Sequence, residues 1–177
     1  MTRPRCSVFV ATSADGYLAG PDGEIDWLEP VNAMADAESY GFHAFYATVD
    51  ALVMGRRTYE AALSFPKWPY PDKRVYVMTN RPVAPRHGER MVFGAPDAVL
   101  ASLEAKHVYL DGGVVIRQFL AANLVDDLTI SIAPVVLGGG VRLFEGGERK
   151  HALELVGTQT WPSGLVQLRW RLPGVRT

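Results

Sequence analysis

The chain has 177 residues, a formal net charge of −1 at pH 7, 48% hydrophobic residues and 21% charged residues. This composition is typical of one globular domain, which we expect to cover residues 1–177. The absence of a basic excess argues against general binding to nucleic acids or membrane surfaces. No apolar stretch approaches the length of a membrane span.

The N-terminal segment predicts a cytoplasmic protein. Its apolar run is short and is soon interrupted by Thr12, Ser13 and Asp15, unlike a signal peptide. The single cysteine, Cys6, excludes an intrachain disulfide, and we interpret it as a buried strand thiol rather than a nucleophile.

Strands and helices alternate along the first two thirds of the chain. Short apolar runs bounded by turn residues predict strands over 6–11, 51–54, 74–78 and 108–110. Helices are predicted over about 34–49, 57–63, 96–103 and from Gly113 to about Ala122. This order indicates a largely parallel sheet with helices on both faces.

The last third changes to period-two alternation over 128–133 and 166–172, which predicts antiparallel strands. The expected fold is therefore α/β, with one mixed sheet that is mostly parallel and ends in a C-terminal antiparallel hairpin.

Three predicted strand ends carry residues suited to phosphate. Gly55 is followed by Arg56 and Arg57 at a helix start, and Gly112-Gly113 opens the next such helix. Free N–H groups and the positive dipole end of a helix attract phosphate, and guanidinium groups add charge. Thr79-Asn80-Arg81 follows a third strand.

Each of these turns also has a purely structural interpretation. The glycines are compatible with tight turns, the arginines with solvated surface positions, and Asn80 with an ordinary turn before Pro82. Together they favour a dinucleotide site, and Arg56, Arg57 and Arg81 favour NADP over NAD because the 2′-phosphate needs cations. The Gly-x-Gly-x-x-Gly fingerprint is absent from the sequence, so an ordinary Rossmann domain is not expected.

The chain also resembles a known family. The segments V-M-G-R-R-T-Y-E (53–60), V-Y-V-M-T-N-R-P (75–82) and V-Y-L-D-G-G-V-V-I-R-Q-F-L (108–120) resemble dihydrofolate reductases. The opening S-A-D-G-Y-L-A-G (13–20) and the segment 128–144, with its triple glycine, resemble one branch of that fold. That branch is the reductase (RibD C-terminal) domain of bacterial riboflavin biosynthesis and its stand-alone relatives.

The resemblance implies an NADPH site and a homodimer. Residues implied at the adenosine-phosphate side are Gly55, Arg56, Arg57 and Thr58, with Thr79, Asn80 and Arg81 around the ribose 2′-phosphate. Asp111, Gly112, Gly113, Val114 and Val115 would wrap the pyrophosphate, with a cis peptide between the two glycines, and Ala11, Leu18 and Ala19 would frame the nicotinamide.

Substrate contacts are expected from Ser13, Asp15, Pro134, Gly138, Gly139 and Gly140. The triple glycine is compatible with a backbone nest for a substrate phosphate, helped by Arg142, or with a plain chain reversal. Candidate proton donors are Asp15, Asp26 and Glu38, of which Asp15 is best placed, although Asp-Gly is also a common turn pair. Trp27 is interpreted either as a lid over the substrate or as a loop anchor.

The sequence departs from true dihydrofolate reductases around Trp27, where the next acidic residues, Asp36 and Glu38, lack the matching context. The histidines show no metal-binding spacing, so no metal is expected. We therefore predict an NADPH-dependent reductase of a small heterocyclic or ribosylaminopyrimidine substrate, such as a riboflavin precursor. The alternatives are a dihydrofolate or pterin reductase, a non-catalytic NADP-binding module, and a structural dimerisation domain.

Overall fold

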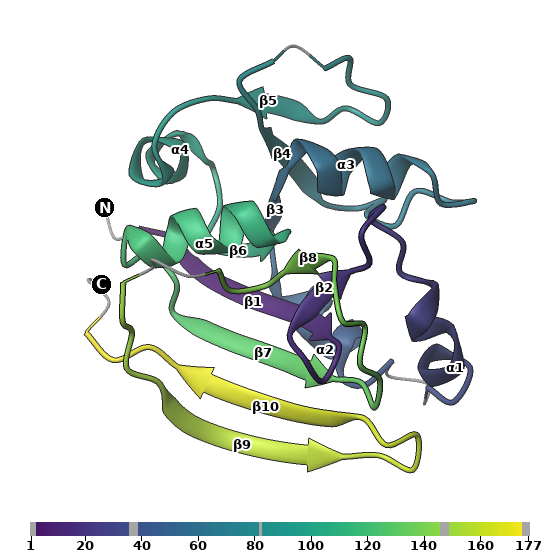
Figure 1. Ribbon diagram of the computed structural model, residues 1–177. Coiled ribbons are helices and arrows are strands. Elements are labelled where there is room, and N and C mark those ends of the chain that lie inside the picture. Colours follow the sequence, from purple (N-terminus) through teal and green to yellow (C-terminus); the bar gives the residue numbers. More distant parts are fainter. Residues whose placement is uncertain (1–2, 36–38, 82, 146–148, 175–177) are drawn as a thin grey trace.

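A mixed sheet forms the centre of the molecule in the computed structural model, which describes residues 3–35, 39–81, 83–145 and 149–174 (Figure 1). Within these ranges the sheet has eight strands in the order β5-β4-β3-β6-β1-β7-β10-β9. The strands are β1 (Arg5–Thr12), β2 (Tyr17–Ala19), β3 (Ala51–Gly55), β4 (Arg74–Met78), β5 (Arg90–Val92), β6 (His107–Asp111), β7 (Asp127–Ile132), β8 (Val141–Arg142), β9 (Glu154–Thr160) and β10 (Val166–Arg171). The helices are α1 (Glu29–Asn32), α2 (Phe42–Thr48), α3 (Arg56–Leu63), α4 (Pro96–Ser102) and α5 (Gly113–Ala121), with a 3-10 turn at Asp26–Leu28.

Strand direction confirms the predicted fold class. The strands β1, β3, β4, β5, β6 and β7 pair in parallel, whereas β10 is antiparallel to both β7 and β9. The C-terminal hairpin is formed by β9 and β10, not by the two predicted strands 128–133 and 166–172, which pair as β7 and β10 without being consecutive. The β9–β10 pair lies beyond the helices at one margin of the sheet (Figure 1). The short strands β2 and β8 pair separately.

Helices cover both faces of the sheet because the central strands carry apolar side chains on both faces. On one face, α4 and α5 pack on Val8, Val53 and Leu110. On the other face, α2 and α3 pack on Leu52 and Phe9. Burial of each such side chain contributes roughly 1.5–3 kcal/mol before conformational entropy is subtracted. Cys6 is fully buried, which confirms its interpretation as a core thiol.

The structure corrects one predicted helix. Instead of a continuous helix over 34–49, α2 starts only at Phe42, and residues 36–38 lie outside the described part of the chain. Ser39, Tyr40 and Gly41 have φ of 48°, 59° and 83°. These left-handed angles cannot belong to a right-handed helix, so the helix cannot extend back through them.

The prediction also missed β2, β5, β8 and β9. The first three have only two or three residues each, too short for a period to be seen. In β9 the side chains are almost all exposed, so no apolar face marks the strand in the sequence. No helix in the described ranges is long and apolar enough to cross a membrane.

Candidate functional site

The three phosphate-suited turns lie at one edge of the sheet. They follow β4, β3 and β6, which are consecutive parallel neighbours, and the register pairs Gly55 with Met78 and Met54 with Asp111. The carboxyl ends of these strands therefore form one rim, the usual position of ligands in open α/β sheets. We call residues 55–58, 79–81 and 111–115 the rim.

The first rim turn combines an open backbone with two arginines. Gly55 precedes α3, which has no side-chain cap at its start. A Cβ on Gly55 would lie 3.6 Å from the Val115 Cγ2, an ordinary contact, so packing alone does not require glycine there. Arg56 is bound to Glu60 at 2.6 Å, whereas Arg57 is exposed. Of the two, Arg57 is the freer guanidinium.

At the second rim turn, Gly112 has a φ of 88°, and a Cβ there would lie 2.2 Å from Thr58 Oγ1. Gly113 is buried against Leu18 and the carbonyl of Arg142. Both glycines are therefore required by packing or backbone conformation. The described residues contain no cis peptide, so the expected cis bond between them is wrong, and the positive φ of Gly112 makes the turn instead.

The residues after Gly113 divide between surface and core. The side chain of Val114 is 55% exposed, whereas that of Val115 is buried in the core shared with α5. Helix α5 begins without a side-chain cap, so no side chain of the described residues caps its first N–H groups. A ligand at this turn would meet backbone groups and the Val114 side chain.

In the third rim turn the Thr79 hydroxyl accepts the N–H of Arg81 at 3.1 Å and donates to its carbonyl at 2.9 Å. Thr79 therefore closes the turn. Asn80 and Arg81 are exposed beyond it. The residues thus form an ordinary turn, which was one of the two predicted alternatives. The turn also leaves Arg81 exposed at the rim.

A carboxyl group with an unusual environment ends β6. Asp111 accepts a hydrogen bond from the Tyr70 hydroxyl at 3.1 Å, and burial raises the pKa of Asp111 above its ordinary range. It shares a sheet face with Tyr109, whose hydroxyl donates to the Phe9 carbonyl at 2.8 Å. The sequence assigned Asp111 only to pyrophosphate binding, because no local pattern reveals burial or the distant Tyr70.

Asp15 does not lie free at the site. Its carboxylate accepts the Ser13 hydroxyl at 2.6 Å and the N–H groups of Leu137 at 3.1 Å and Gly138 at 2.7 Å. These bonds, led by that of Ser13, lower the pKa of Asp15 to about 2. The amide of Gly138, expected in a nest for a substrate phosphate, is therefore bound by a carboxylate of the chain itself.

The triple glycine, residues 138–140 (the glycine element), packs against the segment 13–20 (the opening loop). Gly140 has a φ of 130° and contacts the carbonyl of Ala19, while Gly139 faces open space. Arg142 lies over the Tyr17 ring at 4.5 Å and donates to its hydroxyl at 2.7 Å. This element closes on the chain itself, which corresponds to the predicted alternative of a plain reversal.

The other candidate residues lie around the end of β1. Trp27 packs beside Val31 and Leu165, as a loop anchor would, and its indole nitrogen has no hydrogen-bond partner among the described residues. Pro134 contacts Gly164. Asp26 is exposed, and Glu38 and Asp36 lie outside the described residues. Trp27 is therefore placed to hold the loop near the sheet.

A pocket of about 340 Å³ lies on the α2 face of the sheet, beside the carboxyl half of β1. Its lining is mostly apolar, and only Ala11 was predicted at the site. The lining residues are Phe9, Val10, Ala11, Leu28, Val31, Asn32, Ala35, Ser39, Tyr40, Phe42, Ser131 and Leu165. The apolar residues among them look like core residues in the sequence, and only the tertiary fold shows that they surround a space. We call it the ring pocket.

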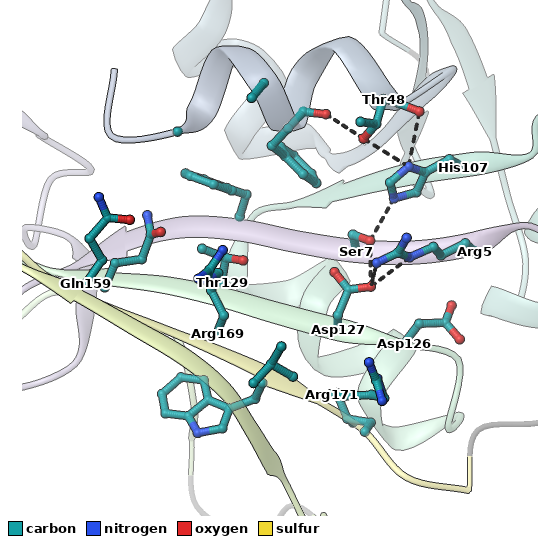
Figure 2. A pocket seen from close by; sticks show the side chains of 18 of the residues that line it. Arg5, Ser7, Thr48, His107, Asp126, Asp127, Thr129, Gln159, Arg169 and Arg171 are labelled. Atoms are coloured by element: carbon teal, nitrogen blue, oxygen red, sulfur yellow. Dashed lines mark hydrogen bonds and ion pairs between the residues drawn. The ribbon is translucent and has the colours of Figure 1, made fainter. Parts of the chain in front are cut away.

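A larger groove of about 1240 Å³ continues along the same face toward the amino ends of the strands (Figure 2). There Ser7 Oγ lies 2.7 Å from His107 Nε2 and donates to Asp127 at 2.9 Å. Arg5 also bonds Asp127. Ser7 is fully buried, and this network joins three adjacent strands.

Comparison with known proteins gives the family. The model of the RibD C-terminal domain matches residues 4–167. The chain belongs to the RibD C-terminal domain family. Its relatives include YwjB of Bacillus subtilis, which is 34% identical over 170 residues, covering 92% of this chain and 95% of that protein. Dihydrofolate reductase HdrB of Haloferax volcanii is 31% identical over 127 residues, covering 67% of this chain and 62% of HdrB.

Solved structures agree with this assignment. A Shewanella sp. PV-4 protein assigned to riboflavin biosynthesis superposes with a TM-score of 0.84 at 34% identity, covering 95% of this chain and 98% of that one. Dihydrofolate reductase from Enterococcus faecalis, solved with NADP(H), gives 0.69 at 18% identity, with 97% and 98% covered, and so shows the shared fold. Family and relatives together support a reductase of the RibD and dihydrofolate reductase type.

Proposed function

We propose that the protein is an NADPH-dependent reductase that transfers hydride to a small heterocyclic substrate in the ring pocket. The observation that carries the proposal is the meeting of three phosphate-suited turns on one rim, at the ends of β4, β3 and β6. The family match and the likeness to a dihydrofolate reductase solved with NADP(H) also favour it.

The residues of the rim fit an extended, multiply phosphorylated dinucleotide. Arg57 and Arg81 are exposed guanidinium groups suited to a 2′-phosphate. The uncapped first turns of α3 and α5 offer backbone N–H donors for the pyrophosphate. Ala11, which lines the ring pocket, and Leu18, which contacts Gly113, would border the nicotinamide.

When bound, the nicotinamide supplies the hydride, and the chain must orient the ring, exclude water and provide a proton. We assign the proton to Asp111 instead of Asp15. An acid whose pKa is raised keeps its proton closer to neutral pH, whereas Asp15, with a pKa of about 2, is ionised there. Asp111 ends β6, the neighbour of β1 in the sheet, and β1 contributes Phe9 and Ala11 to the ring pocket.

A homodimer is part of the proposal. Strand β9 is a sheet edge, and Leu155 and Val156 on it are 57% and 55% exposed. Exposed apolar edges are sites of strand pairing or docking. Light scattering coupled to gel filtration tests this, and a mass near 19.4 kDa would exclude the dimer.

Calorimetric titration with NADPH and NADH tests the cofactor, and consumption of NADPH with pyrimidine or pterin substrates tests turnover. The proposal expects NADPH binding that is tighter than NADH binding, followed by oxidation with at least one ring substrate. Absence of NADPH binding at millimolar concentration would refute the proposal. Tight binding with no turnover would favour the second candidate, an NADP-binding module without catalysis.

A further inference from the structure

We infer that the adenine ring of NADPH stacks on the side chain of Phe93, the residue that directly follows β5. The inference rests on the proposed function, because it concerns how the same site holds its cofactor. It gives the base a contact of its own, separate from the phosphate contacts proposed for Arg57 and Arg81.

Phe93 lies beside the third rim turn. Strand β5 is the outer neighbour of β4, at the margin of the sheet opposite β9 (Figure 1). The two strands are parallel, with Met78 paired to Val92. The N–H of Thr79 donates to the Val92 carbonyl at 3.2 Å, so the ladder continues past Met78 and brings Thr79 level with Phe93. Phe93 therefore stands at the carboxyl end of its strand, next to the turn that carries Arg81.

The ring of Phe93 is open to a ligand and its backbone is held on both sides. The side chain is 59% exposed, compared with 42% for Phe65 and 44% for Phe144. Val92 before it packs against the core shared with α5, and Gly94 after it turns the chain with a φ of 114°. Single exposed apolar side chains are common on proteins. It is the place of Phe93 on the sheet edge that indicates a ligand.

The order of the strands determines the side on which the base would lie. The proposed path puts the pyrophosphate at the starts of α3 and α5, after β3 and β6, and the 2′-phosphate at Arg81 after β4. The base and the 2′-phosphate are attached to adjacent carbons of one ribose, so the base stays close to Arg81. The pyrophosphate takes the side toward β3, which leaves the side toward β5. Neighbouring strands lie roughly 4.8 Å apart, so Phe93 is within reach of a base there.

Stacking is the contact that a phenylalanine ring offers to a base. Face-to-face contact removes apolar area of both rings from water, which is favourable, and it adds the dispersion attraction between them. Aromatic side chains bind nucleic-acid bases in the same way in many proteins. With Arg81 on the phosphate and Phe93 on the base, two independent contacts would hold the two sides of one ribose.

Calorimetric titrations with adenosine 2′,5′-bisphosphate and with NADPH test the inference. The bisphosphate contains the base, the ribose and the 2′-phosphate but no nicotinamide, so it probes this half of the site alone. Phe93→Ala should weaken the binding of both ligands by a similar factor, about fivefold or more. Phe93→Tyr keeps the aromatic face and should stay within about twofold of wild type, whereas Phe93→Leu keeps apolar bulk without a ring and should fall between the two.

A matched control and two further measurements separate the possible outcomes. Phe65→Ala removes an exposed phenylalanine two residues beyond the far end of α3 and should change neither affinity. The Tm of each variant checks the fold, and gel filtration checks whether the Phe93 ring instead contacts a second copy of the chain. Wild-type affinity in Phe93→Ala, or a change of oligomeric state without a change of affinity, would overturn the inference and leave the proposed function intact. Failure of the wild-type protein to bind NADPH would refute the proposed function itself.

Discussion

The carboxylate of Asp15 accepts the N–H of Gly138 at 2.7 Å and thereby joins the turn after β1 to the glycine element after β7. With the bonds from Ser13 and Leu137, this interaction holds the ionised form of Asp15 and lowers its pKa to about 2. The ionised carboxylate of Asp15 therefore holds the opening loop in place through hydrogen bonds. The opening loop borders the rim, where Leu18 contacts Gly113.

Asp15→Asn should lower the Tm at neutral pH, because an amide accepts these N–H bonds less strongly than a carboxylate. The native pKa lies below the ordinary value of about 3.9, so the stabilisation is present above about pH 4 and is lost as the pH falls toward 2. Calorimetric scans from pH 7 to 2 should show the Tm difference shrinking in this window. Asp26→Asn, at an exposed site, is the control, and a difference independent of pH would contradict the assignment.

A glycine series separates ligand contact from packing at the rim. Gly55→Ala is compatible with the fold, since φ is −79° and the new Cβ would make an ordinary contact. We expect Tm within a few degrees of wild type but NADPH affinity reduced about tenfold, because the methyl group would meet the cofactor backbone. Gly139→Ala, in open space, should change neither quantity.

Gly112→Ala should instead destabilise the protein. Its φ of 88° and ψ of 136° are closed to alanine, which costs about 1–3 kcal/mol, and the Cβ would collide with Thr58 Oγ1. Urea unfolding measures the loss of stability.

The Gly55→Ala variant gives the contradicting outcome for the cofactor path. If this variant binds NADPH as tightly as wild type, the cofactor does not approach β3 and the proposed path along the rim is wrong.

The sequence identified the rim turns because each is local: a buried strand, then glycine or a hydroxyl, then a helix or turn start. Gly55, Gly112 and Thr79 lie where these patterns put them, and the alternation of strands and helices was enough to bring them together on one edge. The sequence did not show that the amide of Gly138, expected in a phosphate nest, is bound by Asp15, 123 residues away. No local pattern shows that a backbone amide is already taken.

The ring pocket was not predictable for a related reason. Phe9, Val31 and Phe42 are apolar residues at ordinary core spacing, and core and pocket wall look alike in a sequence. Ser39 and Tyr40 of the lining belong to the left-handed turn at Ser39–Gly41, which delays the start of the expected helix to Phe42. Tyr40, whose carbonyl bonds Gln167, adopts a positive φ for tertiary reasons that local propensity does not contain.

The pH dependence of hydride transfer tests the role of Asp111. The acid must be protonated to act, and burial raises its pKa, so the rate should fall as pH rises through that pKa. Asp111→Asn keeps an acceptor for Tyr70 but cannot donate the proton, so we expect kcat reduced roughly 10²-fold or more and this limb of the pH profile lost. An unchanged profile would show that the proton comes from elsewhere.

Tyr70→Phe distinguishes a chemical role of Asp111 from a structural one. The hydrogen bond from Tyr70 favours the ionised carboxylate, so removing it should raise the pKa of Asp111 further. The falling limb of the kcat profile should then move to higher pH with little change in KM for NADPH. A loss of activity with no shift in pH would indicate that Tyr70 only supports the fold.

The most direct test of the rim as the NADPH site is the affinity of Arg81→Ala for NADPH and NADH, measured by calorimetry. Arg74→Ala, at the opposite end of the same strand, is the matched control. A charge-assisted bond from Arg81 to the 2′-phosphate predicts a loss of roughly 1.5–3 kcal/mol for NADPH, little loss for NADH, and no change for either cofactor in the control. Equal losses for both cofactors, or none for NADPH, would contradict the account.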